Sequence, residues 1–287
     1  MLPSQSAAQL LATSQAELEK LLVNFERDPS RAGFFDIGAV AEVLALSERI
    51  QAARSLTATL ADAASRWLRS GLLEDAAFAR VEFVYHTAVL CYLARHGKDY
   101  SGADMLTVKR LFEARLIGRS ELPVVTQQVT GAYLSLCGVH ADFTQQGQRD
   151  LVLMIDKRVL RTRSDEYDIA VLIMCAQLLQ FGANPSQSRP LLFPQILLTQ
   201  AIRSVNLNWL SVLAFLCAKV FGLPYWLRAA AVECILDHLP PKGDLLPWPK
   251  SNACDSKYIQ RASRGLRLRS TIALALYFND LGDFNHE

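Results

Sequence analysis

The sequence predicts an all-α protein. Apolar residues recur at helical spacing along most of the 287 residues, and the alternation typical of strands is scarce. Four apolar helical segments each end in a glycine, at intervals of 41, 44 and 40 residues; these are Gly97, Gly138, Gly182 and Gly222. A period of about 40 residues is typical of two-helix repeats. We therefore expect stacked antiparallel helical hairpins that form a curved array or an α/α toroid.

Two helix starts are predicted near the N-terminus. Ser14 and Glu17 have the spacing of a capping box, in which two side chains satisfy free N–H groups at a helix end, so a helix is expected to begin at Ser14. Asp36 is expected to cap the second helix. Because no Gly or Pro occurs in residues 39–70, we predict two helices there, with a break at residues 53–57.

Residues 55–287 are predicted to form a helical-hairpin domain, and residues 1–54 a helical extension that makes a single compact unit with it. In each interval between the glycines, a more polar helix precedes a more apolar one, as an outer and an inner layer of hairpins would require. The polar helices are predicted at 103–116, 148–160 and 190–203, and the apolar helices at 121–137, 165–181 and 206–221. A final helix is expected at about 257–281.

Composition excludes several classes of protein. With 51% apolar and 20% charged residues, the chain is neither disordered nor fibrous. The 30 Lys and Arg residues nearly balance the 28 Asp and Glu residues, which gives no electrostatic support for a nucleic-acid partner. The most apolar window, 209–223, is shorter than the roughly 20 residues of a membrane span. No secretory signal is recognised and the cysteines lack disulfide spacing, so the chain is predicted to be cytoplasmic.

Two acidic and histidine-containing segments suggest a metal site. Glu82 and His86 stand four residues apart, as do Glu233 and Asp237, with His238 adjacent. Helical i, i+4 spacing places such pairs on one face, and a helical di-iron site takes about four carboxylates and two histidines from several helices. The other interpretation is that Glu82 and His86 form a buried acid–base pair and that the second segment is a solvated face. The ferritin-like Glu-x-x-His spacing is absent from both segments.

Cys137, His140 and Asp142 place a thiol, an imidazole and a carboxylate at one predicted helix-to-loop corner. A nucleophilic cysteine needs a nearby base and a lowered pKa. The partial negative charge of a helix C-terminus opposes thiolate formation, so a helix cap followed by a polar turn explains the same residues.

The C-terminal run from Lys257 to Arg269 carries basic residues and no acid. Arg261, Arg264 and Arg267 recur at i, i+3 and i+6, roughly on one helix face. Such a face could bind an anionic partner, and it is also the pattern of an ordinary solvated surface.

The segment around Asp165–Gly182 resembles part of a poorly characterised family of all-helical bacterial proteins, some of which accompany specialised-metabolite gene clusters. The resemblance covers about 20 of the 287 residues. The family segment carries a His and an Asp before its Phe-Gly, where this chain has Ala176 or Gln177 and Gln180. The resemblance implies a helical fold and a bacterial biosynthetic context, and it transfers no catalytic residue.

Two functions from different classes are predicted, and the sequence leaves open whether the protein is an enzyme. The first is an accessory or interaction protein in bacterial specialised-metabolite biosynthesis, whose concave surface or C-terminal arginines hold a protein or peptide partner or a small molecule. The absence of phosphate-loop, dinucleotide, nucleophile-elbow and zinc motifs favours it, because stacked hairpins commonly serve as binding surfaces. The alternative is a di-iron type oxygenase with iron at a buried site of Glu82, His86, Glu233, Asp237 and His238.

Overall fold

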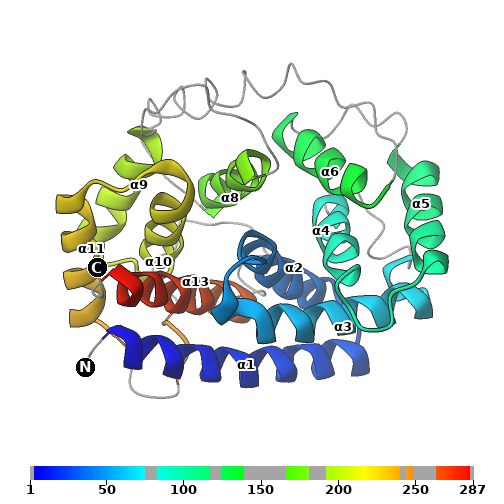
Figure 1. Ribbon diagram of the computed structural model, residues 1–287, viewed down its shortest axis with the longest axis horizontal. Coiled ribbons are helices and arrows are strands. Elements are labelled where there is room, and N and C mark those ends of the chain that lie inside the picture. The colour runs from blue at the N-terminus through cyan, green and yellow to red at the C-terminus, as the bar shows by residue number, and fades with distance from the viewer. Residues whose placement is uncertain are drawn as a thin grey trace.

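The structure, a computed structural model, describes residues 3–74, 83–116, 124–138, 166–180, 192–239, 244–247 and 263–284. These residues form eleven α-helices and no strand, so the predicted all-α class is confirmed for them (Figure 1). The helices are α1 (Pro3–Arg27), α2 (Arg31–Leu46), α3 (Arg54–Ser70), α4 (Val84–Ala94), α5 (Gly102–Leu116), α6 (Val124–Leu136), α8 (Glu166–Gln180), α9 (Leu192–Arg203), α10 (Leu207–Leu216), α11 (Tyr225–Asp237) and α13 (Ser263–Phe284).

The C-terminal helix α13 is part of the centre of the molecule. It packs against α1, α2 and α10, and Figure 1 shows it running beside α10 and above α1. Residues 268–278 of α13 are buried on every side, as expected of a helix that is apolar around much of its circumference. One continuous apolar cluster extends from Ala7 to Phe278. The two ends of the chain therefore build the same core.

The apolar helices pack on one another in chain order. Helix α4 contacts α6, α6 contacts α8, and α8 contacts α10, while α2 packs on both α4 and α8. The helices α3 and α9 pack on α4 and α10, respectively, and Figure 1 shows α5 and α11 at opposite edges of the molecule. Charged side chains on α2, α4 and α13 are thereby brought together inside the core.

The helix boundaries of the predicted hairpins agree with the structure within a few residues. Helices α5, α6, α8 and α9 lie where they are expected, and the predicted helix at 206–221 is α10 followed by a π-helical turn at Cys217–Phe221. The predicted helix at 148–160 lies outside the described residues. The expected start of the last helix at 257 also lies outside them, and α13 is described from Ser263.

Both predicted caps near the N-terminus are wrong. Ser14 is buried in the middle of α1, because the apolar stripe continues upstream through Leu10 and Ala7 and keeps the chain helical there. Helix α2 is capped by Ser30, whose Oγ accepts a hydrogen bond from the backbone N of Gly33 at 3.2 Å. Asp36 instead lies within α2, where its carboxyl group is buried.

The break between α2 and α3 exists but begins earlier than predicted. The break spans residues 47–53. At its start, Ser47 Oγ donates a hydrogen bond to the backbone carbonyl of Val43 at 2.7 Å. Thr57, at the end of the predicted break, lies inside α3. A serine hydroxyl competes with backbone N–H groups for helical carbonyl acceptors. This competition explains why α2 ends next to Ser47.

The described glycines of the predicted repeat lie at turns. Gly138 and Gly222 follow helical segments with φ values of 76° and 87°, the left-handed conformation that glycine adopts without a Cβ clash. Gly97 follows α4 for a different reason, which is close packing: an added Cβ would lie 2.8 Å from the carbonyl oxygen of Ala61 on α3. Gly182 lies outside the described residues.

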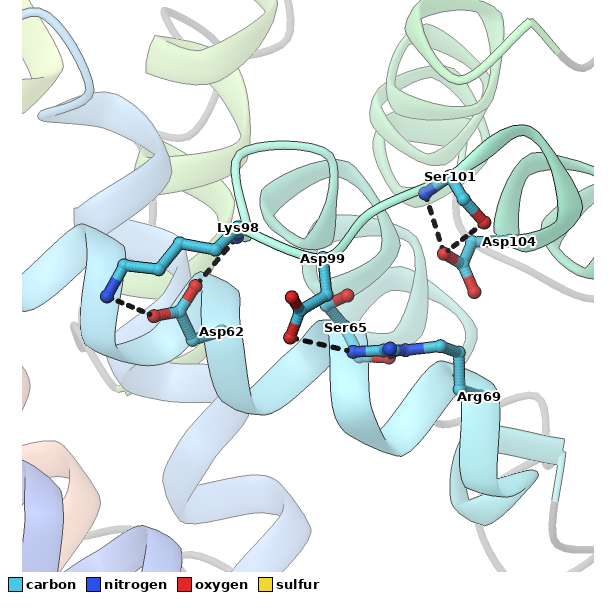
Figure 2. Close-up of polar contacts among 7 residues, drawn as sticks. All are labelled: Asp62, Ser65, Arg69, Lys98, Asp99, Ser101 and Asp104. Atoms are coloured by element: carbon cyan, nitrogen blue, oxygen red, sulfur yellow. Dashed lines mark hydrogen bonds and ion pairs between the residues drawn. The ribbon is translucent and has the colours of Figure 1, made fainter.

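The turn after Gly97 is fastened to α3 by polar contacts, as Figure 2 shows. The backbone N of Lys98 donates to Asp62 Oδ1 at 2.9 Å, and Arg69 Nη2 lies 3.3 Å from Asp99 Oδ2. The next helix starts immediately, because Asp104 Oδ2 accepts from the backbone N of Ser101 at 2.7 Å. These contacts fix the direction in which α5 leaves α4.

The turn between α9 and α10 contains a residue in an unfavourable conformation. Val205 has φ 51°, and its backbone N donates to Ile202 O while the N of Asn206 donates to Ala201 O. This is the hydrogen-bond pattern of the Schellman motif, whose left-handed position is usually a glycine. Asn206 then caps α10, since its Oδ1 accepts from the N of Trp209.

Within the part of the chain that the structure describes, no helix has both the length and the apolar character needed to cross a membrane.

Candidate functional site

Three ionisable side chains meet inside the apolar core. They are Glu42 on α2, His86 on α4 and Arg269 on α13, and their exposed fractions are 3%, 6% and 1%. His86 Nε2 lies 3.1 Å from Glu42 Oε1, and Arg269 Nη1 lies 3.7 Å from Glu42 Oε2. A buried charge without a partner is strongly destabilising, so the carboxylate links all three helices.

Two further polar side chains extend this buried cluster to α8. Gln177 Nε2 donates to the backbone carbonyl of Glu42 at 2.9 Å, and the Tyr85 hydroxyl donates to Gln177 Oε1 at 2.7 Å. Burial raises the pKa of the Tyr85 phenol well above its usual range, so the hydroxyl stays protonated and keeps its role as a donor. The network therefore joins α2, α4, α8 and α13.

The His86 ring is held in place by shape as well as by hydrogen bonding. It packs on the backbone of Gly38, where an added Cβ would overlap the ring, and it meets Phe35 edge-on with 5.4 Å between ring centroids. Its Nδ1 atom is buried and makes no hydrogen bond with the residues described. A carboxylate that orients an imidazole is also the arrangement used in acid–base catalysis, so this pair can hold a proton in a fixed position.

The predicted metal ligands are not brought together. His86 pairs with Glu42, which the metal prediction did not include, and Glu82 lies outside the described residues. Glu233, Asp237 and His238 are exposed at α11, far from α4 in Figure 1. Across the described ranges, no group of three or more His, Cys, Asp or Glu side chains is placed to hold a metal ion.

Of the three residues in the cysteine prediction, the structure describes Cys137. Cys137 lies at the end of α6, and burial raises the pKa of its thiol to about 11, although Arg95 acts in the opposite direction. His140 and Asp142 lie outside the described residues. A raised pKa disfavours the thiolate that a nucleophilic cysteine requires.

The predicted partner-binding arginines make contacts within the chain. Arg264 Nη2 lies 2.6 Å from Glu17 Oε2 on α1, and Arg264 Nε donates to the same oxygen at 3.2 Å. Arg267 donates to the backbone carbonyls of Leu246 and Leu245, at 2.7 and 3.1 Å. Arg261 lies outside the described residues. The basic side of α13 therefore ties this helix to α1 and to residues 244–247.

A second buried carboxyl group lies where α2 and α13 meet. Asp36 Oδ1 accepts a hydrogen bond from the backbone N of Gly265 at 2.7 Å, in the first turn of α13. The two helices come so close here that a Cβ on Gly265 would overlap the backbone of Asp36. Burial raises the pKa of Asp36 to about 7, against the lowering effects of the Gly265 hydrogen bond and the Arg264 charge.

Sequence reasoning missed Glu42 and Arg269 because their partners are remote in the chain. Glu42 and His86 are separated by 44 residues. A signal was nevertheless present: Glu42 is the single charge in an otherwise apolar stretch, Ala39–Leu46. A lone charge in the middle of a buried helix requires a partner from another element.

Helix α11 presents apolar side chains on two sides. Leu227, Ala231 and Ile235 are buried, and the helix packs on α9 and α10. The opposite side includes Tyr225, Trp226 and Leu236, which are 86%, 65% and 38% exposed. At 100° per residue, six exposed residues fall within an arc of about 120°. We call them the outer face of α11: Tyr225, Trp226, Ala229, Glu233, Leu236 and Asp237.

No protein-family model, curated protein or solved structure matches this chain. The resemblance of the segment around 165–182 to a helical bacterial family therefore stays a prediction.

Proposed function

We propose that the protein is a non-catalytic interaction protein that contacts a protein or peptide partner through the outer face of α11. The observation that carries this proposal is the exposure of Tyr225 and Trp226, 86% and 65%, side by side at the start of the helix. Tyrosine and tryptophan are among the residues most enriched in interface hot spots. Burying a large apolar side chain contributes roughly 1.5–3 kcal/mol, so a partner that covers both gains substantially.

The occurrence of apolar residues on both sides of α11 supports the same conclusion. A helix that is apolar all round is normally buried all round. Among the described elements, α9 and α10 pack on α11, and the side carrying Tyr225 and Trp226 is exposed. A partner bound to the outer face would cover Tyr225 and Trp226, and α11 would then be buried on both sides.

The order of helix packing also favours an interaction protein. The succession of α4, α6, α8 and α10 is the one expected for stacked hairpins in a curved array or toroid. Such stacks commonly offer extended binding surfaces. In this proposal α11 is the helix that follows the stack and carries the contact surface, and the partner belongs to the bacterial biosynthetic context implied by the resemblance.

The charged groups of α13 support α11 over α13 as the contact surface. Arg264 and Arg267 already bind Glu17 and two backbone carbonyls, so using them for a partner would break contacts that hold the fold. The Glu42 carboxylate is likewise paired with two cations or donors inside the core. These groups stabilise the packing of α13 on α1 and α2.

The proposal is tested by comparing proteins retained by the wild-type chain with those retained by a Tyr225→Ala/Trp226→Ala variant. The matched control is Met105→Ala/Leu106→Ala, which truncates two exposed apolar residues on α5. We expect the control to keep the partner and the α11 variant to lose it, with both variants melting within a few degrees of wild type. Equal retention by all three proteins would contradict the proposal.

The iron-dependent oxygenase is the alternative, favoured by one observation. His86 Nδ1 is buried with no hydrogen-bond partner among the described residues, and Glu82 precedes it by four positions. Arg269 opposes this alternative, because its positive charge 3.7 Å from Glu42 competes with a cation for the carboxylate. Stoichiometric iron in protein expressed anaerobically with added iron, lost in His86→Ala without unfolding, would support it. Protein free of iron under those conditions would overturn it.

A further inference from the structure

We infer that the partner of the outer face of α11 is an amphipathic helix with basic residues beside its apolar stripe. This inference rests on the proposed function and specifies the chemistry of the partner. The outer face combines apolar anchors, Tyr225, Trp226 and Leu236, with two carboxylates, Glu233 and Asp237. A complementary surface therefore needs both apolar side chains and positive charges.

Glu233 and Asp237 both lie on the exposed side of α11. By contrast, the half-buried acids Glu17, Asp62 and Asp280 each form an ion pair with a Lys or Arg side chain. Glu233 and Asp237 form no ion pair within the described ranges, although both are exposed. Within that part of the chain, both carboxylates are accessible to a cation from a partner.

The positions of the apolar and acidic residues along α11 suit a partner helix that lies along the outer face. At 1.5 Å per residue, Glu233 lies about 10 Å along the axis from Trp226, and Asp237 lies about 6 Å further on. A partner helix laid along this face places an apolar residue against Trp226 and Tyr225 at one end. Its Lys or Arg side chains, one turn apart, then reach the carboxylates at the other end.

The aromatic pair adds to the preference for a basic partner. A Lys or Arg side chain beside the apolar stripe can also lie over the face of Trp226 or Tyr225, where the ring attracts a cation. An anionic membrane surface is a poorer match, because exposed aromatic residues would be drawn toward it while Glu233 and Asp237 would be repelled by acidic headgroups. Charge thus favours a basic peptide over a lipid surface.

The test uses three synthetic peptides of equal length, about two heptads long: an amphipathic Leu/Lys helix, a scrambled Leu/Lys peptide, and an amphipathic Leu/Glu helix. Binding to the full chain is measured by isothermal titration and by fluorescence anisotropy of labelled peptide. We expect the amphipathic Leu/Lys helix to bind at least tenfold more tightly than either of the other two.

Substitutions on α11 test whether the peptide binds to the outer face. Glu233→Lys/Asp237→Lys and Trp226→Ala are each expected to weaken binding about tenfold or more. The matched charge control is Glu19→Lys/Asp28→Lys, which reverses two exposed acids on and after α1 and should change affinity less than twofold. Equal binding of the Leu/Glu helix, or equal loss in the control, would overturn the inference.

Two further outcomes separate this inference from the proposed function. If no peptide binds but the partner is still lost in Tyr225→Ala/Trp226→Ala, the basic-helix inference fails and the proposed function stands. Binding to phosphatidylserine vesicles that exceeds peptide binding and is lost in Trp226→Ala would also overturn the inference, in favour of a membrane surface. If neither peptide nor partner depends on α11, both are wrong.

Discussion

The buried carboxyl group of Asp36 makes stability depend on pH in a direction opposite to that of most acids. Burial raises its pKa from 3.8 to about 7, while the Gly265 N–H and Arg264 act to lower it. As the pH rises from 3.8 to about 7, the unfolded chain releases this proton and the folded chain keeps it. The contribution of Asp36 to the free energy of unfolding therefore falls through that window and is constant above it.

The magnitude follows from the size of the shift. One pKa unit corresponds to about 1.4 kcal/mol, so a shift of about three units lowers the free energy of unfolding by about 4 kcal/mol at pH 8. At pH 5, where the folded chain keeps the proton, the same relation gives a loss of about 2 kcal/mol. Asp36→Asn keeps an oxygen that can accept from Gly265 and carries no charge. Its advantage over wild type should grow by about 2–3 kcal/mol between pH 5 and pH 8.

Urea unfolding followed by far-ultraviolet circular dichroism at pH 5, 6.5 and 8 measures this difference. The matched control is Asp28→Asn, which removes an exposed carboxylate after α1 and should show no such trend. An unsatisfied amide N–H in the Asn variant would cost about 1–3 kcal/mol at every pH, so the slope with pH is the decisive quantity. A difference that is constant with pH, or that shrinks toward pH 8, would refute the reasoning.

Three other substitutions test the fold in the same assay. Val205→Gly should raise the free energy of unfolding by about 0.5–1 kcal/mol by relieving the left-handed conformation of a β-branched residue, and an unchanged or lower value would contradict that account. Arg269→Met should lower it by about 3–5 kcal/mol because Glu42 loses its cation, and adding Glu42→Gln should recover part of the loss; no recovery would argue against the ion pair. Gly38→Ala should lower it by about 1–3 kcal/mol by displacing the His86 ring, so wild-type stability would contradict the close packing.

The helices and most of their ends follow from local patterns. The periods of apolar residues correctly predict α5, α6, α8 and α9, because side chains three and four residues apart share a helix face. Gly138 and Gly222 were predicted at turns because the left-handed conformation is a property of the single residue. The capping prediction at Ser14 failed since the same short spacing also occurs inside a continuous helix, and burial of Leu10 upstream extends α1 past it.

The candidate sites depended on contacts between distant residues. The sequence indicates His86 as a metal ligand or as part of a buried pair with Glu82, and the structure pairs it with Glu42, 44 residues away. The arginines of α13 were expected to face a partner, and the structure places Arg264 against Glu17, 247 residues away. Exposure of Tyr225 and Trp226 was not predicted, because both belong to a helix whose apolar residues occur on all sides.

By itself the sequence determined that this chain is helical and where many of its helices end, since a helix is built from interactions between residues at most four positions apart. Only the tertiary structure decided which face of each helix is covered and which charge meets which. Those choices depend on packing such as that of α2 against α4 and α13, elements separated in the chain whose approach no local pattern specifies. Burial then turns Glu42, His86 and Arg269 into one interacting cluster.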